Sequence, residues 1–124
     1  MGNLCVSRMV PLAYYKMAMK KLISSSEVVE TVYGDGGEWE VCAAAEADYD
    51  ESDSRVVVEL ESFLRKASTS GDVEVRQLPW LPGKSRVTEH APREEASQVA
   101  HDVFASWVRK VRHSIPPEPL KSSA

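Results

Sequence analysis

The chain of 124 residues is long enough for one small domain, and its composition, 43% hydrophobic and 27% charged, excludes a wholly disordered polypeptide. It contains no run of about 18 apolar residues, so no segment is expected to cross a membrane by itself. The net charge of −4 is unevenly spread: residues 1–26 carry four bases and no acid, whereas residues 27–62 carry twelve acids and one base. An anionic surface would therefore attract the basic head.

The chain opens with MGNLCVSR, in which Gly2 follows the initiator Met and Cys5 lies three residues further on. An N-terminal glycine can accept myristate, although the hydroxyl residue expected at the sixth position is replaced by Val6, with Ser7 one residue late. One acyl chain binds membranes only marginally, and palmitate on Cys5 together with the bases of the head would supply the second signal. The start predicts lipidation at Gly2 and Cys5 and attachment to the cytoplasmic face of a membrane, with the plasma membrane as the expected one.

An acid-free N-terminus with basic and apolar residues is also typical of a mitochondrial presequence, which is removed before the protein acts. In that alternative the protein is mitochondrial, and neither Gly2 nor Cys5 has a role in its mature form. A secretory signal is disfavoured, because Lys16, Lys20 and Lys21 interrupt any apolar core.

Next along the chain, residues 11–23 favour a basic helix, because proline is tolerated in a first turn and Ala, Met, Lys and Leu favour helix. Residues 27–33 and 38–42 predict a β-hairpin about the turn GDGG, since β-branched and aromatic residues flank glycines that permit positive φ. Residues 46–54 are strongly acidic, and we expect them to form a mobile, solvated loop.

Residues 55–67 are interpreted as a short middle helix, although VVVEL could equally extend as a strand. The expected fold class is therefore small α+β and partly disordered, with a long C-terminal amphipathic helix. Its expected divisions are a membrane-targeting head 1–26, an α+β region 27–83, a polar connector 84–91, the helix 92–113 and a disordered tail 114–124.

The clearest pattern lies in residues 92–113, where apolar residues recur at the i, i+3, i+4 and i+7 spacing of an amphipathic helix. Pro92 suits the first turn, and acids near the start and bases near the end complement the helix dipole. The apolar stripe consists of Ala96, Val99, Ala100, Val103, Phe104, Trp107, Val108 and Val111. Such a stripe either packs as the core of the domain or docks into a hydrophobic groove on a partner.

The segment AxxVAxxVFxxWV, from Ala96 to Val108, resembles the helix by which A-kinase anchoring proteins bind the regulatory-subunit dimer of cyclic-AMP-dependent protein kinase. The MGxxC start adds to the resemblance, because short members of that family are held to membranes by acyl chains. Trp107 departs from it, since the family usually has a smaller aliphatic side chain there. The resemblance implies a membrane-tethered adaptor whose apolar stripe binds the regulatory subunit of that kinase.

Ser68 follows two bases in RKAS, the spacing that cyclic-AMP-dependent kinase prefers, and is a candidate phosphorylation site. The alternative is a basic helix end that complements its own dipole. No motif for a nucleophile, phosphate loop or metal site occurs, so we expect no enzyme activity, cofactor or metal, and the acidic chain disfavours nucleic acid as a partner. The alternative function is an accessory subunit of a larger assembly, for example a mitochondrial one, in which helix 92–113 is core.

Overall fold

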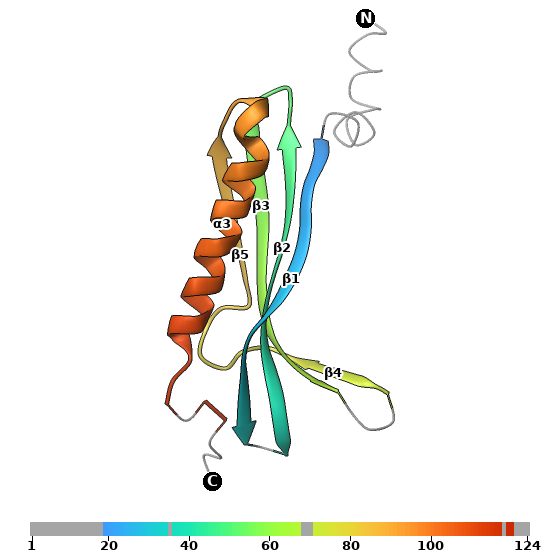
Figure 1. Cartoon of the computed structure of the whole chain (residues 1–124), viewed down its shortest axis with the longest axis vertical. Helices are drawn as coiled ribbons and strands as arrows, with labels where there is room; N and C mark the ends of the chain where they lie inside the picture. Colours follow the sequence, from blue (N-terminus) through green and yellow to red (C-terminus); the bar gives the residue numbers. More distant parts are fainter. Residues whose placement is uncertain (1–18, 35, 68–70, 118, 121–124) are drawn as a thin grey trace, which may run out of the picture.

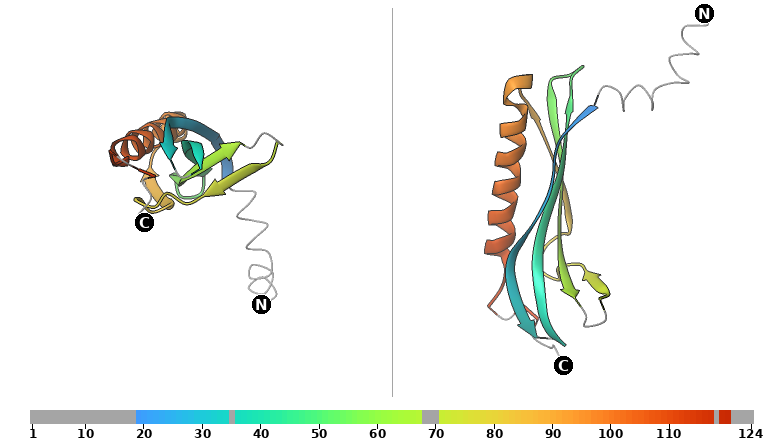
Figure 2. Two further views of the ribbon diagram at one scale, coloured as in Figure 1. Left: turned by 90° about the horizontal axis from the view of Figure 1, so that it is seen from below. Right: turned by 45° about the vertical axis from the view of Figure 1, so that its right-hand side comes forward.

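The computed structural model describes residues 19–34, 36–67, 71–117 and 119–120, and shows a twisted antiparallel sheet with one helix against one of its faces (Figure 1). The elements are, in chain order, β1 (Met19–Gly34), β2 (Gly37–Asp50), β3 (Arg55–Ala67), β4 (Val73–Arg76), β5 (Lys84–His90) and α3 (Arg93–Ser114). β2 lies between β1 and β3, and the other edge of β3 is shared by β5 and β4. The second sheet face carries no helix among the described residues (Figure 2).

The predicted hairpin is present as β1 and β2, which turn between Gly34 and Gly37. Both glycines have positive φ, at 141° and 131°, a conformation that side chains with a Cβ rarely adopt. Both strands run well beyond the predicted 27–33 and 38–42, because every second residue of β2 is apolar and buried. These residues are Trp39, Val41, Ala43, Ala45, Ala47 and Tyr49.

The middle helix predicted over residues 55–67 is wrong, because this segment forms β3. Leu60 and Leu64 are four residues apart, a spacing that fits one face of a helix and one face of a strand equally well. Pairing with β2 over Arg55–Arg65 and with β5 over Arg55–Glu61 decides the outcome. The valine run favours it too, since β-branched side chains fit a pleated surface.

The acidic loop predicted over residues 46–54 is also wrong in its first half, since residues 46–50 complete β2 and only residues 51–54 form a turn. Bases on neighbouring strands compensate the acids: Lys21 Nζ lies 2.6 Å from a Glu46 carboxylate oxygen, and Arg55 Nη2 lies 3.1 Å from Asp50 Oδ2. Hydrogen bonds from Ser52 and Arg55 hold the pKa of Asp50 below its ordinary value. Paired charges of this kind allow an acidic segment to remain in a sheet.

Of the basic helix expected over residues 11–23, residues 11–18 lie outside the described residues, and residues 19–23 begin β1. Met19 pairs with Asp50 and Ile23 with Ala47, so strand pairing overrides the local helix propensity. Residues 84–90, expected as a polar connector, form β5, in which Val87 opposite Val58 is the only partly buried side chain. The fold is therefore mostly β with one C-terminal helix, and not the α+β fold with three helices that we expected.

The helix predicted over 92–113 is confirmed as α3. It packs on the face of the sheet that carries the alternating apolar residues of β2 and the side chains of Val56, Val58, Leu60 and Leu64 of β3. The tail expected to be disordered is partly packed as well: Ile115 and Leu120 contact the core, and a Cβ added to Gly34 would lie 3.0 Å from Leu120. The core is therefore one layer of side chains between the sheet and α3.

Candidate functional site

Three of the residues predicted to be functional cannot be placed. Gly2 and Cys5, predicted for lipidation, and Ser68, the candidate phosphorylation site, lie outside the described residues. No helix of the described part combines the length and apolar character needed to cross a bilayer.

The eight residues predicted for partner binding all lie where α3 meets the sheet. Ala96, Ala100 and Val111 are fully buried, and Trp107 and Val108 are only 5% and 6% exposed. The other three, at the margins of the interface, are partly buried: Val99, Val103 and Phe104. The apolar stripe is therefore occupied by the protein's own sheet.

Hydrogen bonds from aromatic side chains fasten α3 along its length. Near its start, Tyr49 on β2 donates its hydroxyl to the Ala91 carbonyl oxygen at 2.8 Å. Trp107 donates its indole N–H to the Glu61 carbonyl oxygen on β3 at 2.9 Å, and Trp80 donates to Ser114 Oγ at 3.0 Å near the helix end. Each aromatic ring adds a large apolar contact, and its polar tip makes a directional hydrogen bond. These hydrogen bonds therefore fix the position of α3 along the sheet.

The outer edge of β1 is a free edge of the sheet. β2 pairs with one side of β1, and within the described residues no strand pairs with the other side. Register shifts between Lys21 and Ile23 and between Val28 and Glu30 bracket six residues in regular pairing, Ile23–Val28. In an antiparallel strand alternate N–H and C=O groups point away from the neighbour, so this edge offers unpaired donors and acceptors over about 20 Å.

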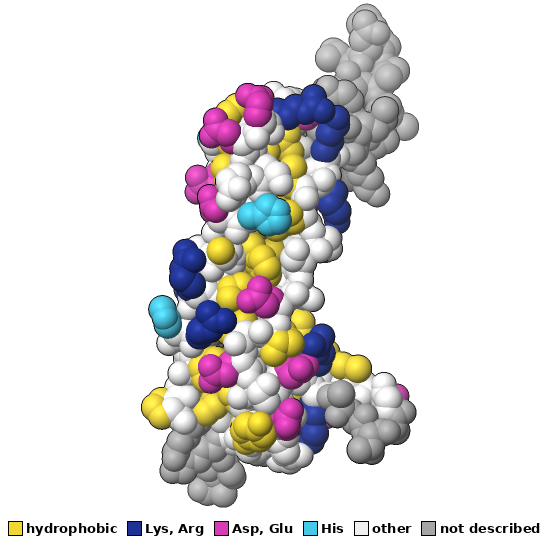
Figure 3. Space-filling model, viewed as in Figure 1, with side chains coloured by type: hydrophobic (Ala, Val, Ile, Leu, Met, Phe, Trp, Pro, Cys, Tyr) yellow, Lys and Arg dark blue, Asp and Glu magenta, His cyan; other side chains and the backbone are white. Residues whose placement is uncertain are grey.

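A groove of about 470 Å³ runs between this edge and α3, on the helix side of the sheet. Ser25 and Glu27 of β1 form one wall. The other wall is one face of α3, formed by His101, Phe104, Ala105, Val108, Arg109 and Arg112. Figure 3 shows hydrophobic side chains along the seam between α3 and β1, with Lys and Arg side chains over the C-terminal half of the helix. We call this surface the β1–α3 groove.

The charge of the β1–α3 groove is unbalanced. Within the described residues Arg109 and Arg112 form no ion pair with a carboxylate, although Glu27 lines the same groove. Most other arginines of the described part are paired: Arg55 with Asp50, Arg65 with Glu40 at 2.9 Å and Arg86 with Glu59. Two guanidinium groups against one carboxylate leave an excess of positive charge beside the free edge.

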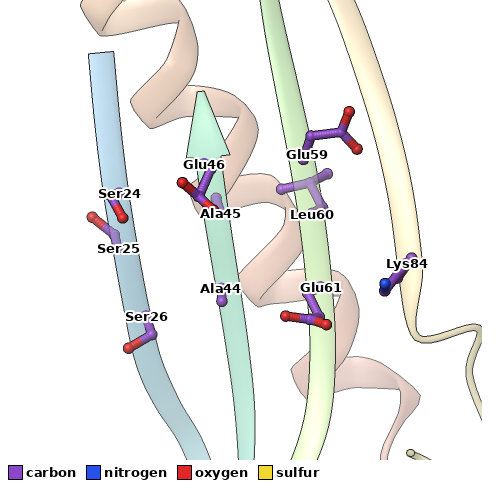
Figure 4. Close-up of a pocket in the computed structure, with 10 residues that line it drawn as sticks. All are labelled: Ser24, Ser25, Ser26, Ala44, Ala45, Glu46, Glu59, Leu60, Glu61 and Lys84. Atoms are coloured by element: carbon purple, nitrogen blue, oxygen red, sulfur yellow. The ribbon is translucent and has the colours of Figure 1, made fainter. Parts of the chain in front are cut away.

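A second hollow, of about 400 Å³, lies on the opposite face of the sheet (Figure 4). Its floor over β1 and β2 is formed by small side chains, those of Ser24, Ser26 and Ala44. Two of its acids are already paired, Glu46 with Lys21 and Glu59 with Arg86, and the pairing lowers the pKa of Glu46. Because these two acids are already paired, the hollow has less charge available to attract a ligand.

Other chemistry is not evident in the described part of the chain. It contains no group of three or more His, Cys, Asp or Glu side chains placed to hold a metal ion. Cys42, of β2, is 1% exposed, and burial raises the pKa of its thiol, so it remains protonated and shielded at neutral pH. Comparison with models of known families, with curated proteins and with solved structures finds no match.

Sequence reasoning missed the β1–α3 groove. The bases at the end of helix 92–113, which include Arg109 and Arg112, are expected to complement the helix dipole, and residues 24–26 lie between the expected helix 11–23 and the expected strand 27–33. The sequence does indicate that the residues of the helix wall share one face of a helix, because of their spacing: His101, Ala105, Arg109 and Arg112. No local signal shows that this face lies beside the edge of β1.

Proposed function

We propose that this protein is a small membrane-tethered adaptor that captures an extended segment of a partner protein at the free edge of β1. The observation that supports the proposal is the coincidence of two features at Ile23–Val28: an unpaired strand edge and a groove along its helix side. A segment that added a strand there would satisfy the outward N–H and C=O groups of β1. Its alternate side chains would enter the β1–α3 groove, which supplies selectivity.

The basic head supports the tether in this proposal. Residues 1–26 carry four bases without an acid, and β1 begins at Met19, directly after most of that head. Acylation at Gly2 and Cys5 would hold the domain at the cytoplasmic face of a membrane, with Arg8 and Lys16 adding attraction to anionic lipid. The other two bases of the head, Lys20 and Lys21, lie in β1 and are paired with Glu51 and Glu46. A partner segment captured on β1 would thereby be held close to that surface.

The tether is tested by replacing Gly2 with Ala in the full-length protein and separating membranes from the soluble fraction of native cells. Loss of the acylated amine is expected to move most of the protein into the soluble fraction, since one remaining acyl signal binds only marginally. Cys5→Ser is expected to act in the same direction. Unchanged membrane association of Gly2→Ala, or an intact mass that shows cleavage near residue 25, would contradict the tether.

Capture at the edge is tested by photo-crosslinking in the same cells. Benzoylphenylalanine placed at Ser25, in the groove beside the free edge, is expected to yield a discrete adduct with a partner protein. The matched control is the same group at Ser97, which is exposed on α3 and does not line the groove. Equal adduct patterns from the two positions would contradict capture at β1.

Binding of the regulatory-subunit dimer of cyclic-AMP-dependent protein kinase is the second candidate function. It is favoured by the resemblance of Ala96–Val108 to anchoring helices and by the partial exposure of Val99, Val103 and Phe104. Docking of the whole stripe requires α3 to leave the sheet. A 92–113 peptide is expected to bind the dimer at micromolar concentration or below, with Val103→Pro abolishing binding, and the full chain is expected to bind more weakly. No binding of the peptide at high concentration would contradict this candidate.

A further inference from the structure

The helix wall of the β1–α3 groove carries a specific arrangement of charge. Arg109 and Arg112 lie three residues apart on one face of α3, with His101 two turns toward the helix start. Phe104 and Val108 are the apolar members of the same wall, and Ser25 lies opposite them on β1. The groove thus combines cations, an apolar surface and a hydroxyl beside an unpaired strand edge.

We propose that the segment captured at this edge is anionic, with a carboxylate or phosphate side chain bound by Arg109 and Arg112. The inference rests on the proposed capture of an extended segment at β1 and specifies the chemistry of its occupant. Guanidinium groups bind carboxylate and phosphate oxygens through parallel hydrogen bonds, and in the described part of the chain no acid occupies these two. An added strand places every second side chain on the helix side, so one anionic residue meets the arginines while its neighbours face away from them.

Glu27 limits where along the captured segment an anionic group can lie. Its carboxylate lines the β1 wall, so it repels a second anion placed directly on the strand while leaving the arginines of the opposite wall unpaired. The expected segment therefore carries its anionic group toward α3 and apolar or hydroxyl side chains elsewhere. A basic segment would meet the two arginines as like charges.

The test uses the ¹⁵N-labelled full-length protein and three synthetic peptides followed by NMR titration. The first peptide is acetyl-Thr-Val-Glu-Val-Glu-Val-Thr-amide, the second has Gln in place of Glu, and the third has phosphoserine in place of Glu. We expect the Glu and phosphoserine peptides to shift the amide signals of Ile23–Val28 and of the C-terminal half of α3, and the Gln peptide to bind at least about tenfold more weakly. The stronger of the two anionic peptides identifies the group that the site prefers.

The variants separate site binding from general electrostatic attraction. Arg109→Glu and Arg112→Glu, made singly, are each expected to weaken binding of the Glu peptide at least about fivefold, whereas Glu27→Gln is expected to strengthen it. Lys110→Glu is the matched control, because Lys110 lies over the Trp107 ring at 5.7 Å and does not line the groove, and it is expected to change affinity less than about twofold. Equal effects of the reversals at 109, 112 and 110 would overturn the inference.

Two further outcomes would overturn the inference that the captured segment is anionic. They lead to different conclusions about strand addition at β1. If the Gln peptide binds as tightly as the Glu peptide and shifts the same six residues, the anionic chemistry fails while strand addition stands. If no peptide binds and sedimentation shows a dimer of this chain with the β1 signals broadened, the edge is occupied by a second copy. The crosslink at Ser25 then decides separately whether a partner protein is captured.

Discussion

Replacing Ala100 by Asp is expected to destabilise the domain by at least about 3 kcal/mol, out of the roughly 5–15 kcal/mol typical of small domains. Ala100 is fully buried between α3 and the sheet, so the new carboxylate has neither solvent nor space. Chemical denaturation followed by circular dichroism measures the free energy of unfolding directly. The substitution separates a helix that forms the core from a helix presented on a tether, because only the first is sensitive to charge at this position.

Ala105→Asp is the matched control, since Ala105 lies on the same helix and is exposed. Both substitutions carry the same loss of helix propensity, about 0.7 kcal/mol, so their difference reports burial alone. We expect Ala105→Asp to cost no more than about 1 kcal/mol. Equal destabilisation by the two substitutions would show that the apolar stripe of α3 does not face the sheet.

Replacing Trp107 by Ala is the second substitution with a large expected effect, about 3–5 kcal/mol. Trp107 is 5% exposed, and its indole N–H is bonded to the Glu61 carbonyl oxygen of β3. The variant loses the largest side chain of α3, leaves a cavity against the sheet and removes the partner of that carbonyl. Because the change also removes a fluorophore, urea unfolding followed by circular dichroism is the suitable measurement.

Two further variants separate the contribution of the Trp107 hydrogen bond from that of the ring. Trp107→Phe keeps most of the ring and loses the hydrogen bond, and we expect it to cost about 1–2 kcal/mol. Ser106→Ala, at the exposed neighbouring position, is expected to change stability by less than about 0.5 kcal/mol. A cost below about 1 kcal/mol for Trp107→Ala would mean that this ring is not part of the core.

The elements that could be predicted from the sequence are those whose pattern is local. α3 has about six turns of one repeating spacing, with Pro92 before it and Pro116 after it, and no strand register competes with that pattern. The β1–β2 turn depends on glycines at 34 and 37, whose positive φ values only a few residue types accept. In both cases neighbouring residues supply the decisive physical preference.

The elements that were missed depend on partners distant in sequence. The Ala-rich, acidic second half of β2 has poor strand propensity by itself and becomes a strand because Lys21 and Arg55 neutralise its acids from both neighbours. β5 has one partly buried side chain, Val87, and owes its form to pairing with β3. Such tertiary pairing cannot be seen in a window of residues.

The candidate site was hidden for the same reason. Of its strand wall, Ser25 lies between the expected helix 11–23 and the expected strand 27–33, and Glu27 begins that strand. In its helix wall, the bases are expected only to complement the helix dipole. Ser25 and Arg109 are far apart in the sequence, and only the packing of α3 against the sheet brings them to one groove. The sequence did indicate an amphipathic helix with two possible destinations for its apolar stripe, and the structure places that stripe on the sheet.

The most direct test of the packing of α3, on which the groove depends, is native-state amide hydrogen exchange of the full-length protein. The structure predicts that amides of α3 between Ala96 and Val111 open together with those of β2 and β3, with the same free energy as global unfolding, because they share one core. Exchange of α3 amides at a much lower free energy than those of β2 and β3 would show a helix that detaches from a folded sheet. That result would contradict the account and favour a helix available to a partner.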